Sequence, residues 1–471
     1  MDQQATPSTN EISAIDAAEI AARVDRVPVG RFHVRLAVTL GTVTFFDSFD
    51  ILSVAVVLSL ITNTLGFGLT EAGLIISAGY LGQWIGMLLV GVLADSLGRR
   101  RAFIFASALF GAMSLLCAFA WDQTTLLVFR AVQGLGLGAE VPIAAILLSE
   151  YLGRRNRGRI SVLYQSVLTW GIFFAPLVAL LCTSSFGPDL GWRILLAVGS
   201  LPLLVAVWSW FSLPESARWL AVKGRVSEAD KYVRAMEEHA RARGVTLQTP
   251  EVKPLAAGES GKFRMREIFS PAYRRRTVMV ALLWFTTFFM IVGCLSWLPT
   301  MYVKIGKLSH SQSLLLTLAM SGLQMVIVYV TAMLIDKVGR RPLLLLGLAL
   351  AAAGALYGVM TIGVLGLATW QNLFVSGVIM TVGTTVPGVF LYLYTIELYP
   401  TRMRSWATSA TASLGKLASI VSPSIFGFML AGYGGPPAIF GALSIAAVVA
   451  LAAVLIGGVE TRGRSLEETS E

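Results

Sequence analysis

A series of long apolar runs, separated by short polar stretches, constrains this chain more than any other feature. A helix needs about 20 mostly apolar residues to cross a bilayer core of roughly 30 Å. Twelve such runs occur, near residues 35–62, 71–94, 101–120, 124–149, 160–184, 192–212, 276–303, 311–335, 342–364, 370–396, 406–432 and 436–457. Because helices can satisfy their backbone hydrogen bonds inside lipid, we expect an all-α integral membrane protein with twelve transmembrane helices.

Charge supports the same interpretation. Only 14% of the residues are charged, against about 25% in a soluble domain. The net charge of +10 could suggest nucleic acid, but Lys and Arg gather in alternate loops, and loops 62–71, 121–125 and 431–437 contain neither. This alternation is the positive-inside pattern of membrane proteins, whereas a nucleic-acid surface collects its charge on one face. We therefore expect an inner-membrane protein with cytoplasmic termini, lipid around it and no nucleic-acid partner.

The two sets of six runs carry matching motifs. Asp95, Gly98 and Arg99 close the second run, and Asp336 and Arg340 stand in the same places after the eighth, at an offset of 241 residues (336 − 95). A second pattern is Glu-x4-Arg-x-Arg, which occurs after the fourth and tenth runs at an offset of 247 (397 − 150) and includes Glu150, Arg157, Glu397 and Arg404. An internal repeat of this kind is typical of transporters.

The repeat predicts a domain organisation. We expect two pseudo-symmetric six-helix bundles at 35–213 and 276–458, joined by a cytoplasmic linker at 214–275 that carries one or two surface helices. Residues 1–34 and 459–471 are expected to be cytoplasmic tails, the first with a short amphipathic helix ending near Val27. The linker has too few apolar residues for a separate catalytic domain.

The Asp-x-x-Gly-Arg motif resembles the signature loop between helices two and three of the major facilitator superfamily, and the resemblance covers nearly the whole chain. The stretches 214–220 and 460–467 are similar to the sugar-porter and organic-ion-carrier branch. Within it, residues 46–50, 136–142 and 394–401 look most like bacterial niacin transporters (the NiaP group), and the Asp-x-x-Asp pair resembles aromatic-acid/proton symporters. The motif residues Asp95, Gly98, Arg99, Glu150, Arg157, Asp336, Arg340, Glu397 and Arg404 are then expected to form a cytoplasmic gate, with simple charge anchoring as the alternative.

Charged residues inside the apolar runs are the candidates for coupling. Each costs about 2.5–3.5 kcal/mol at the bilayer centre, so each should face an inner cavity and find a partner. The resemblance implies that Asp50 is the proton site and Arg130 its partner; a static ion pair is the alternative. Asp47 is either a second proton site or a substrate contact. Glu140 is either a further coupling acid or a partner for backbone freed by Pro142.

Lys416 is a lone cation in the eleventh run. Its anionic partner would be Asp47, Glu140 or the carboxylate of a substrate, and we favour the substrate; snorkelling toward an interface is the alternative. Aromatic and amide side chains on neighbouring runs could complete a small-molecule pocket: Gln165, Trp170, Phe174, Trp284, Phe288, Gln324 and Tyr392.

The set of amides that sugar porters use is mostly absent, since the seventh run reads Trp-Phe-Thr-Thr-Phe-Phe-Met. We therefore expect a monomeric symporter of protons and a small aromatic organic acid. The alternatives are a sugar or polyol porter, a multidrug or organic-ion antiporter and, remotely, a membrane sensor. No nucleophile–base pair is evident, and the three cysteines lack metal spacing, so neither an enzyme, a metal nor a cofactor is expected.

Overall fold

The computed structural model describes residues 18–152, 154–250, 265–271 and 273–462. Within these ranges it leaves the side chains at 154–163, 265–266, 401–402 and 404–405 undescribed. Two predicted gate residues, Arg157 and Arg404, therefore lie outside the described side chains. The predicted amphipathic segment is helical over residues 18–25 and ends just before Val27, as expected.

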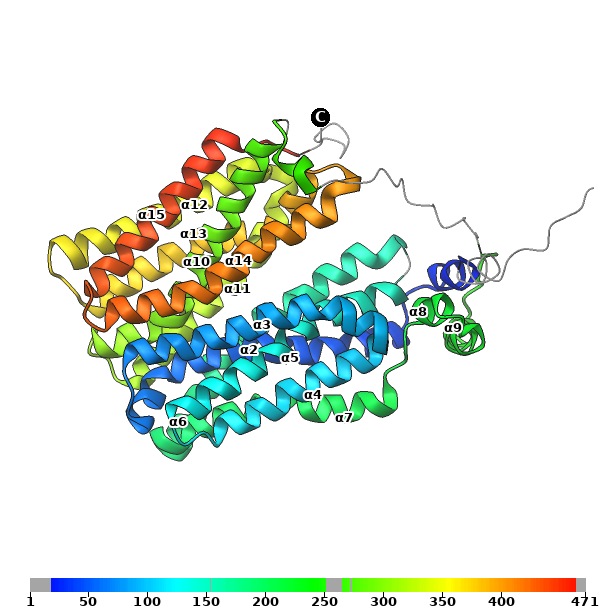
Figure 1. Cartoon of the computed structure of the whole chain (residues 1–471), viewed down its shortest axis with the longest axis horizontal. Helices are drawn as coiled ribbons and strands as arrows, with labels where there is room; N and C mark the ends of the chain where they lie inside the picture. The colour runs from blue at the N-terminus through cyan, green and yellow to red at the C-terminus, as the bar shows by residue number, and fades with distance from the viewer. Residues whose placement is uncertain (1–17, 153, 251–264, 272, 463–471) are drawn as a thin grey trace, which may run out of the picture.

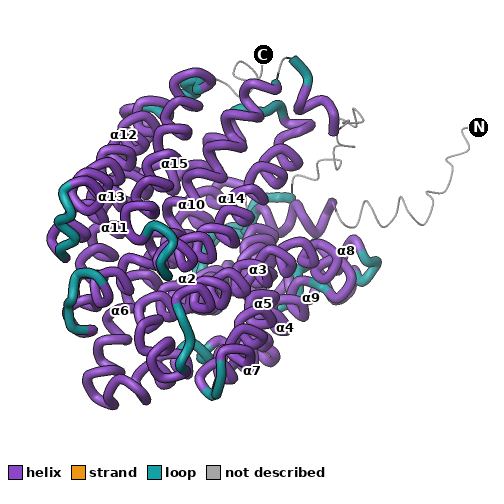
Figure 2. The backbone as a smooth tube through the Cα atoms, turned by 60° about the vertical axis from the view of Figure 1, so that its left-hand side comes forward, coloured by secondary structure: helices purple, strands orange, loops and turns teal. Residues whose placement is uncertain are grey.

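Long helices make up almost all of the described structure (Figures 1 and 2). The first group comprises α2 (Arg31–Leu65), α3 (Leu69–Leu97), α4 (Arg99–Ala118), α5 (Gln123–Tyr151), α6 (Arg154–Val198) and α7 (Pro202–Ser212). The linker contributes α8 (Ala217–Val222), α9 (Val226–Arg241) and the 3-10 turn η1 (Met265–Phe269). The second group comprises α10 (Arg274–Lys304), α11 (His310–Val338), α12 (Arg340–Gly358) with the π-helical turn η2 (Val359–Val364), α13 (Trp370–Glu397), α14 (Thr401–Leu430) and α15 (Gly435–Gly457).

Within the described residues, 11 helical segments are long and apolar enough to cross a membrane. One of them, Tyr164–Ser212, has 49 residues, about 74 Å at 1.5 Å per residue and more than twice a bilayer core. It bends at Gly187, where φ is 76°, and so supplies two crossings. The expected twelve-helix all-α architecture is confirmed.

The boundaries of the fifth and sixth crossings differ from the prediction. No loop separates 184 from 192, because the helix continues through this stretch and only Gly187 leaves the helical conformation. The expected single helix over 192–212 is instead interrupted by turns at 199–201. Pro202 begins α7, where its missing N–H costs no helical hydrogen bond.

Figure 1 places α2–α7 below α10–α15, with α8 and α9 at the right-hand end. We call that end the basic end, because the loops at 98–101 and 339–341 also lie there, and the other end the opposite end. We call α2–α7 the first half and α10–α15 the second half. Close contacts between the halves occur toward the opposite end, where Ser77 and Ser424 hydroxyls lie 2.7 Å apart and Lys304 Nζ donates to Asn63 at 3.5 Å.

Helices α3 and α5 pack backbone against backbone along a row of glycines. A Cβ built on Gly82 would lie 2.9 Å from the Cα of Gly134, and one on Gly86 would lie 3.0 Å from the Cα of Leu135. A Cβ on Gly138 would lie 2.6 Å from the Cα of Gln83. Small residues let membrane helices come this near, so these two helices form one tightly joined pair.

Candidate functional site

An ion pair joins α2 and α5 in the middle of the first half. Arg130 Nη1 donates to Asp50 Oδ2 at 2.5 Å and to Gln133 Oε1 at 2.7 Å. Gln133 Nε2 returns a hydrogen bond to Asp50 Oδ1 at 2.9 Å. The Asp50 and Arg130 side chains are 1% and 6% exposed, so the structure brings together the two residues that the sequence paired and adds Gln133 as a third member.

A second pair of charges lies between the halves. Asp47, one turn before Asp50 on α2, is half-buried and interacts electrostatically with Lys416 of α14. Lys416 Nζ donates to Gln83 Oε1 on α3 at 3.1 Å. Neither anionic partner that we considered, Asp47 or Glu140, contacts Lys416 directly among the described interactions. The described hydrogen-bond partner of Lys416 is therefore a neutral amide, Gln83, from the other half.

Aromatic rings of α10 pack against α14 one residue before Lys416. Trp284 stacks on Phe288 with ring centroids 5.3 Å apart, and the Tyr392 ring meets Trp284 edge-on at 4.5 Å. Gly415, the residue before Lys416, admits these rings: a Cβ there would lie 2.9 Å from Trp284 and 3.1 Å from Phe288. Trp284 Nε1 donates to Thr395 Oγ1 at 3.0 Å, which fixes the indole. Three predicted pocket residues thus form one cluster next to the predicted cation.

Glu140 lies in a separate buried cluster. Its Oε1 accepts from Thr44 Oγ1 at 3.1 Å, and Thr44 also hydrogen-bonds the Tyr164 hydroxyl. Its Oε2 is buried without a hydrogen-bond partner. The hydrogen bond that Glu140 accepts thus comes from the Thr44 side chain, and the two roles considered for Glu140, a coupling acid or a partner for backbone freed by Pro142, stay predictions.

The remaining predicted pocket residues of α6 lie elsewhere. Gln165 is exposed on the surface of its helix. Trp170 is 41% exposed and donates from Nε1 to the Tyr329 hydroxyl of α11 at 3.1 Å. Phe174 stacks on Trp170, with centroids 6.2 Å apart. These residues contribute a contact between α6 and α11, and none of their described interactions is with Lys416.

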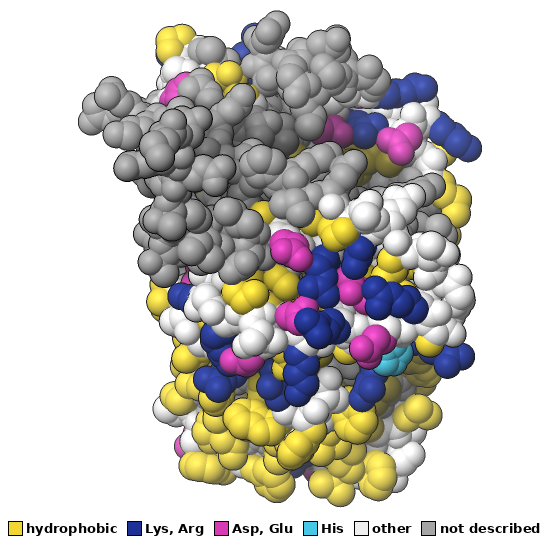
Figure 3. Space-filling view, turned by 90° about the vertical axis from the view of Figure 1, so that its right-hand side faces the viewer, with side chains coloured by type: hydrophobic (Ala, Val, Ile, Leu, Met, Phe, Trp, Pro, Cys, Tyr) yellow, Lys and Arg dark blue, Asp and Glu magenta, His cyan; other side chains and the backbone are white. Residues whose placement is uncertain are grey.

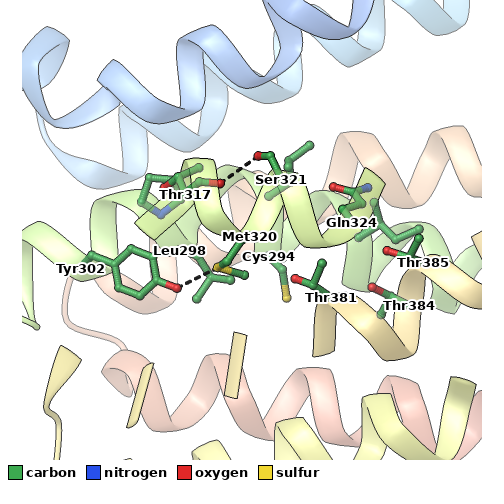
Figure 4. A pocket seen from close by; sticks show the side chains of 13 residues that line it. Cys294, Leu298, Tyr302, Thr317, Met320, Ser321, Gln324, Thr381, Thr384 and Thr385 are labelled. Atoms are coloured by element: carbon green, nitrogen blue, oxygen red, sulfur yellow. Dashed lines mark hydrogen bonds between the residues drawn. The ribbon is translucent and has the colours of Figure 1, made fainter. Parts of the chain in front are cut away.

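Gln324 lines a small cavity between α10, α11 and α13 (Figure 4). The cavity has a volume of about 50 Å³, room for a few water molecules at most. Hydroxyl groups form much of its wall: Tyr302, Thr317, Ser321, Thr381, Thr384 and Thr385. Several of them already donate to their own helix, as Ser321 does to the Thr317 carbonyl at 2.8 Å. The cavity lies further along α10 than the aromatic cluster and is separate from Lys416.

At the basic end of the first half, the predicted gate residues are in contact. Arg99 Nη1 lies 2.8 Å from Asp95 Oδ1, and its Nε lies 3.4 Å from Glu150 Oε1 on α5. Gly98 has a φ of 92°, a conformation that favours glycine, and a side chain there would collide with Glu215. Glu215 Oε1 accepts from the Arg100 backbone N–H at 3.0 Å and so caps α4.

The second half repeats this arrangement with more hydrogen bonds. Arg340 contacts Asp336 at 3.0 Å and binds Glu397 through two nitrogens, at 3.0 and 3.2 Å. Glu460 takes the role of Glu215 and accepts from the backbone N–H groups of Arg340 and Arg341, both at 3.0 Å. Burial alone would raise the pKa of the Glu460 carboxyl, but these backbone hydrogen bonds outweigh it and lower the pKa.

The N-terminal segment is tied to the linker helix α9 at this same end. Arg23 contacts Asp230 at 2.6 Å and Glu237 at 3.1 Å, and Arg26 reaches Glu237 at 2.6 Å. Figure 3 looks onto this end and shows Lys and Arg interleaved with Asp and Glu. Burial would raise the pKa of Glu237, but hydrogen bonds from the two arginines outweigh it and lower the pKa.

Sequence reasoning missed the neutral partners of the charged groups: Gln83, Gln133, Thr44 and Tyr164. A neutral side chain in an apolar run carries little signal, because its burial costs less than that of a charge. The spacing Arg130-x-x-Gln133 could have revealed Gln133, since residues three apart share a helix face.

The sequence resembles those of known membrane transporters over nearly its whole length. The sequence pattern of the family described as "Sugar (and other) transporter" matches residues 38–471. The niacin transporter NiaP of Acinetobacter baylyi is 31% identical over 451 residues, which cover 95% of this chain and 99% of that protein. The gallate transporter of Pseudomonas putida is 29% identical, over 92% of this chain and 94% of that protein.

Among solved structures, the crystal structure of the D-xylose-proton symporter superposes with a TM-score of 0.70. The superposition covers 92% of this chain and 99% of the symporter, and the sequences are 18% identical. This likeness concerns the fold. Together with the matched family pattern, it shows that the chain belongs to the sugar (and other) transporter family of the major facilitator superfamily.

Proposed function

We propose that this transporter imports a small aromatic organic acid together with protons, by alternating access. The bundles at 35–213 and 276–458 would rock about a site near the membrane centre. The protein would lie in the inner membrane as a monomer, with the basic end and both termini in the cytoplasm, because the basic loops follow the positive-inside rule.

One observation carries the choice of substrate: Lys416, a half-buried cation, directly follows the glycine against which a cluster of rings packs. Lys416 would pair with the carboxylate of the substrate, and the Trp284, Phe288 and Tyr392 rings would stack on its aromatic ring. A charged group held in the membrane normally marks a functional site. The niacin and gallate transporters among the relatives are named for aromatic carboxylates, which supports this class of substrate.

The aspartates of α2 would supply the coupling. A substrate carboxylate at Lys416 faces repulsion from ionised Asp47, which a proton on Asp47 removes. A proton on Asp50 weakens its bonds to Arg130 and Gln133 and frees α2 and α5 to shift. Either proton makes acid binding depend on proton supply, which is what a symporter requires. Glu140, with one unpartnered oxygen, is a third candidate acid.

The proposal is tested by uptake into proteoliposomes with an imposed pH gradient. Nicotinate and benzoate are offered beside nicotinamide, which keeps the ring but lacks the negative charge, and beside xylose and glucose. We expect nicotinate or benzoate to accumulate only when the exterior is acidic, and nicotinamide to be excluded. Accumulation of sugars without the acids would overturn the proposal in favour of a sugar porter. Equal uptake with and without the gradient would overturn the proton coupling.

A further inference from the structure

A basic groove lies outside the substrate site, between the start of α2 and α7 at the basic end. Its volume is about 610 Å³. It is lined by Val29, Gly30, Arg31, Val34, Arg35, Val38, Thr39, Trp208 and Arg243. Three different elements contribute to it: the first turns of α2, the middle of α7 and the residues that follow α9.

The chemistry of this groove fits an anion. Arg31, Arg35 and Arg243 all line it, and no Asp or Glu is among its described lining residues. The Arg243 guanidinium lies against Gly30, the residue that caps α2. The first turn of α2 contains no acidic residue, so the positive end of the helix dipole adds to the three cations. The groove therefore concentrates positive charge that no described side chain neutralises.

An apolar groove continues from it along α2. This second groove has a volume of about 560 Å³ and shares Val29, Val34 and Val38 with the first. Beyond these it is lined by Ala37, Gly41, Thr42, Phe45 and Val167, with His33 and Tyr164 as its other polar members. Val34 and Val38 are 57% and 62% exposed. Since α2 is long and apolar enough to span a membrane, these exposed side chains are available to lipid.

Trp208 lines the basic groove together with the valines that the two grooves share. It is 55% exposed, and the Arg35 guanidinium lies 5.4 Å from the centroid of its ring. Tryptophan prefers the boundary between headgroups and acyl chains, and arginine prefers the phosphate level. The two side chains thus mark the depth at which a lipid headgroup would meet its chains.

We propose that the composite groove binds one anionic phospholipid from the leaflet at the basic end. The phosphate and its negative headgroup lie among Arg31, Arg35 and Arg243, and one acyl chain lies along Val34, Val38 and Phe45. A lipid fits better than a protein partner because the apolar groove lies on a membrane-spanning helix, where lipid is the surrounding solvent. This site is separate from Lys416 and does not depend on the proposed substrate.

The test measures lipid retained by the full-length protein. Protein purified with phosphatidylglycerol is exchanged into excess phosphatidylcholine, and bound lipid is counted by native mass spectrometry. The double variant Arg35→Gln/Arg243→Gln removes two cations of the groove. The matched control Lys231→Gln/Lys337→Gln removes two exposed cations outside it. Val38→Trp fills the apolar groove without changing charge, and all variants are checked for monodispersity and helical content.

We expect one phosphatidylglycerol per wild-type protein and about thirtyfold weaker retention in the double variant, since each cation near an anionic lipid surface contributes a factor of about five. Val38→Trp should also lose the lipid, and the control should keep it. Should the double variant fold poorly, the single Arg243→Gln decides, because Arg243 lies outside the helices. Equal retention by wild type and groove variants would overturn the proposal. So would competition by inorganic phosphate that Val38→Trp does not affect, because the site would then hold a free phosphate ion.

Discussion

The two halves of the molecule agree at the basic end and differ at the centre. At the basic end, Arg99 with Glu150 and Arg340 with Glu397 make equivalent contacts. At the centre, the first half holds the buried Asp50–Arg130 pair, whereas the second half presents aromatic rings beside a cation. Duplication thus preserved the contacts that fix the ends of the helices, while the central positions, which face the site, acquired separate chemistries in each half.

The largest effect should come from breaking the central pair of the first half. Arg130→Gln leaves Asp50 buried without its cation, and removing one partner of a buried pair costs about 3–5 kcal/mol. Unfolding of the detergent-solubilised protein by sodium dodecyl sulfate measures the loss. The double variant Asp50→Asn/Arg130→Gln should recover most of it, because neither charge remains. A double variant as unstable as the single one would show that the pair does not act as a unit.

A substitution at the centre of the second half should change the affinity for the substrate rather than the stability of the protein. Lys416→Gln removes the proposed contact with the substrate carboxylate, and a hydrogen bond to a charged group contributes about 1.5–3 kcal/mol. We expect nicotinate or benzoate to bind about thirtyfold more weakly, as measured by calorimetric titration. Lys337→Gln, an exposed cation at the end of α11, is the control. Unchanged affinity in Lys416→Gln would rule out the carboxylate contact.

The aromatic cluster should contribute less than the cation. Tyr392→Leu keeps an apolar side chain but removes the ring that meets Trp284, and an aromatic pair contributes about 0.5–1.5 kcal/mol. The affinity for the acid should fall about fivefold in the same titration. Phe285→Leu provides the control, since Phe285 packs on Phe289 away from this cluster. Equal losses in both variants would indicate a general packing effect instead of ring stacking with the substrate.

The contacts at the basic end offer a finer test of the agreement between halves. Arg340 binds Glu397 through two nitrogens, whereas Arg99 reaches Glu150 through one at 3.4 Å. Ion pairs near a surface contribute about 0–1 kcal/mol. We expect Arg340→Gln to lower the free energy of unfolding by about 1 kcal/mol, and Arg99→Gln by about half of that. The reverse order would mean that the hydrogen-bond geometry does not set the strength of these contacts.

The smallest effect concerns acid pH at the N-terminal segment, which docks on the linker beside the first half. The pKa of Glu237 is lowered in the folded protein, so its contacts with Arg23 and Arg26 stabilise the docked segment at pH values above about 4.3, the ordinary pKa of Glu. That stability is lost as the pH falls below this value and Glu237 takes up a proton. Hydrogen exchange at residues 18–25, corrected for the intrinsic pH dependence, should lose protection between about pH 4.5 and 3. Glu237→Gln should abolish this change.

The sequence was most informative where an alternative structure would leave backbone groups or charges unpaired in lipid, at a high energetic cost. Twelve apolar runs had to be helices in lipid, so the crossings were predictable. A charge such as Asp50 inside the membrane needed a partner, and the family resemblance implied that this partner is Arg130. The partner of Lys416 was not predictable, because Gln83 carries no charge and its apolar run gives no reason to single it out. Periodicity likewise cannot say which face of a two-sided apolar helix points inward, so the assignment of Gln165, an exposed residue of α6, to the pocket stays a prediction.

The helix boundaries around the sixth crossing were also not predictable from the local sequence. A Gly-Pro pair at 187–188 is typical of a loop, yet the helix continues after a single residue with positive φ. A turn at 199–201 was hidden within an unbroken apolar run. The local sequence indicates which residues favour a break in a helix. The packing of α6 against its neighbours determines which of these residues actually leaves the helical conformation.

The glycine row between α3 and α5 has a practical consequence for anyone who wants to watch this transporter move. Helices whose backbones meet at Gly82 and Gly134 leave no room for sliding, so spectroscopic labels placed at the far ends of this pair should report one fixed separation under every condition. The contact of α3 with α14 joins the two halves instead, where the Ser77 and Ser424 hydroxyls meet and a Cβ on Gly73 would lie 3.1 Å from the Cα of Ser424. A label pair across it, calibrated against the fixed one, would read the opening of the molecule directly.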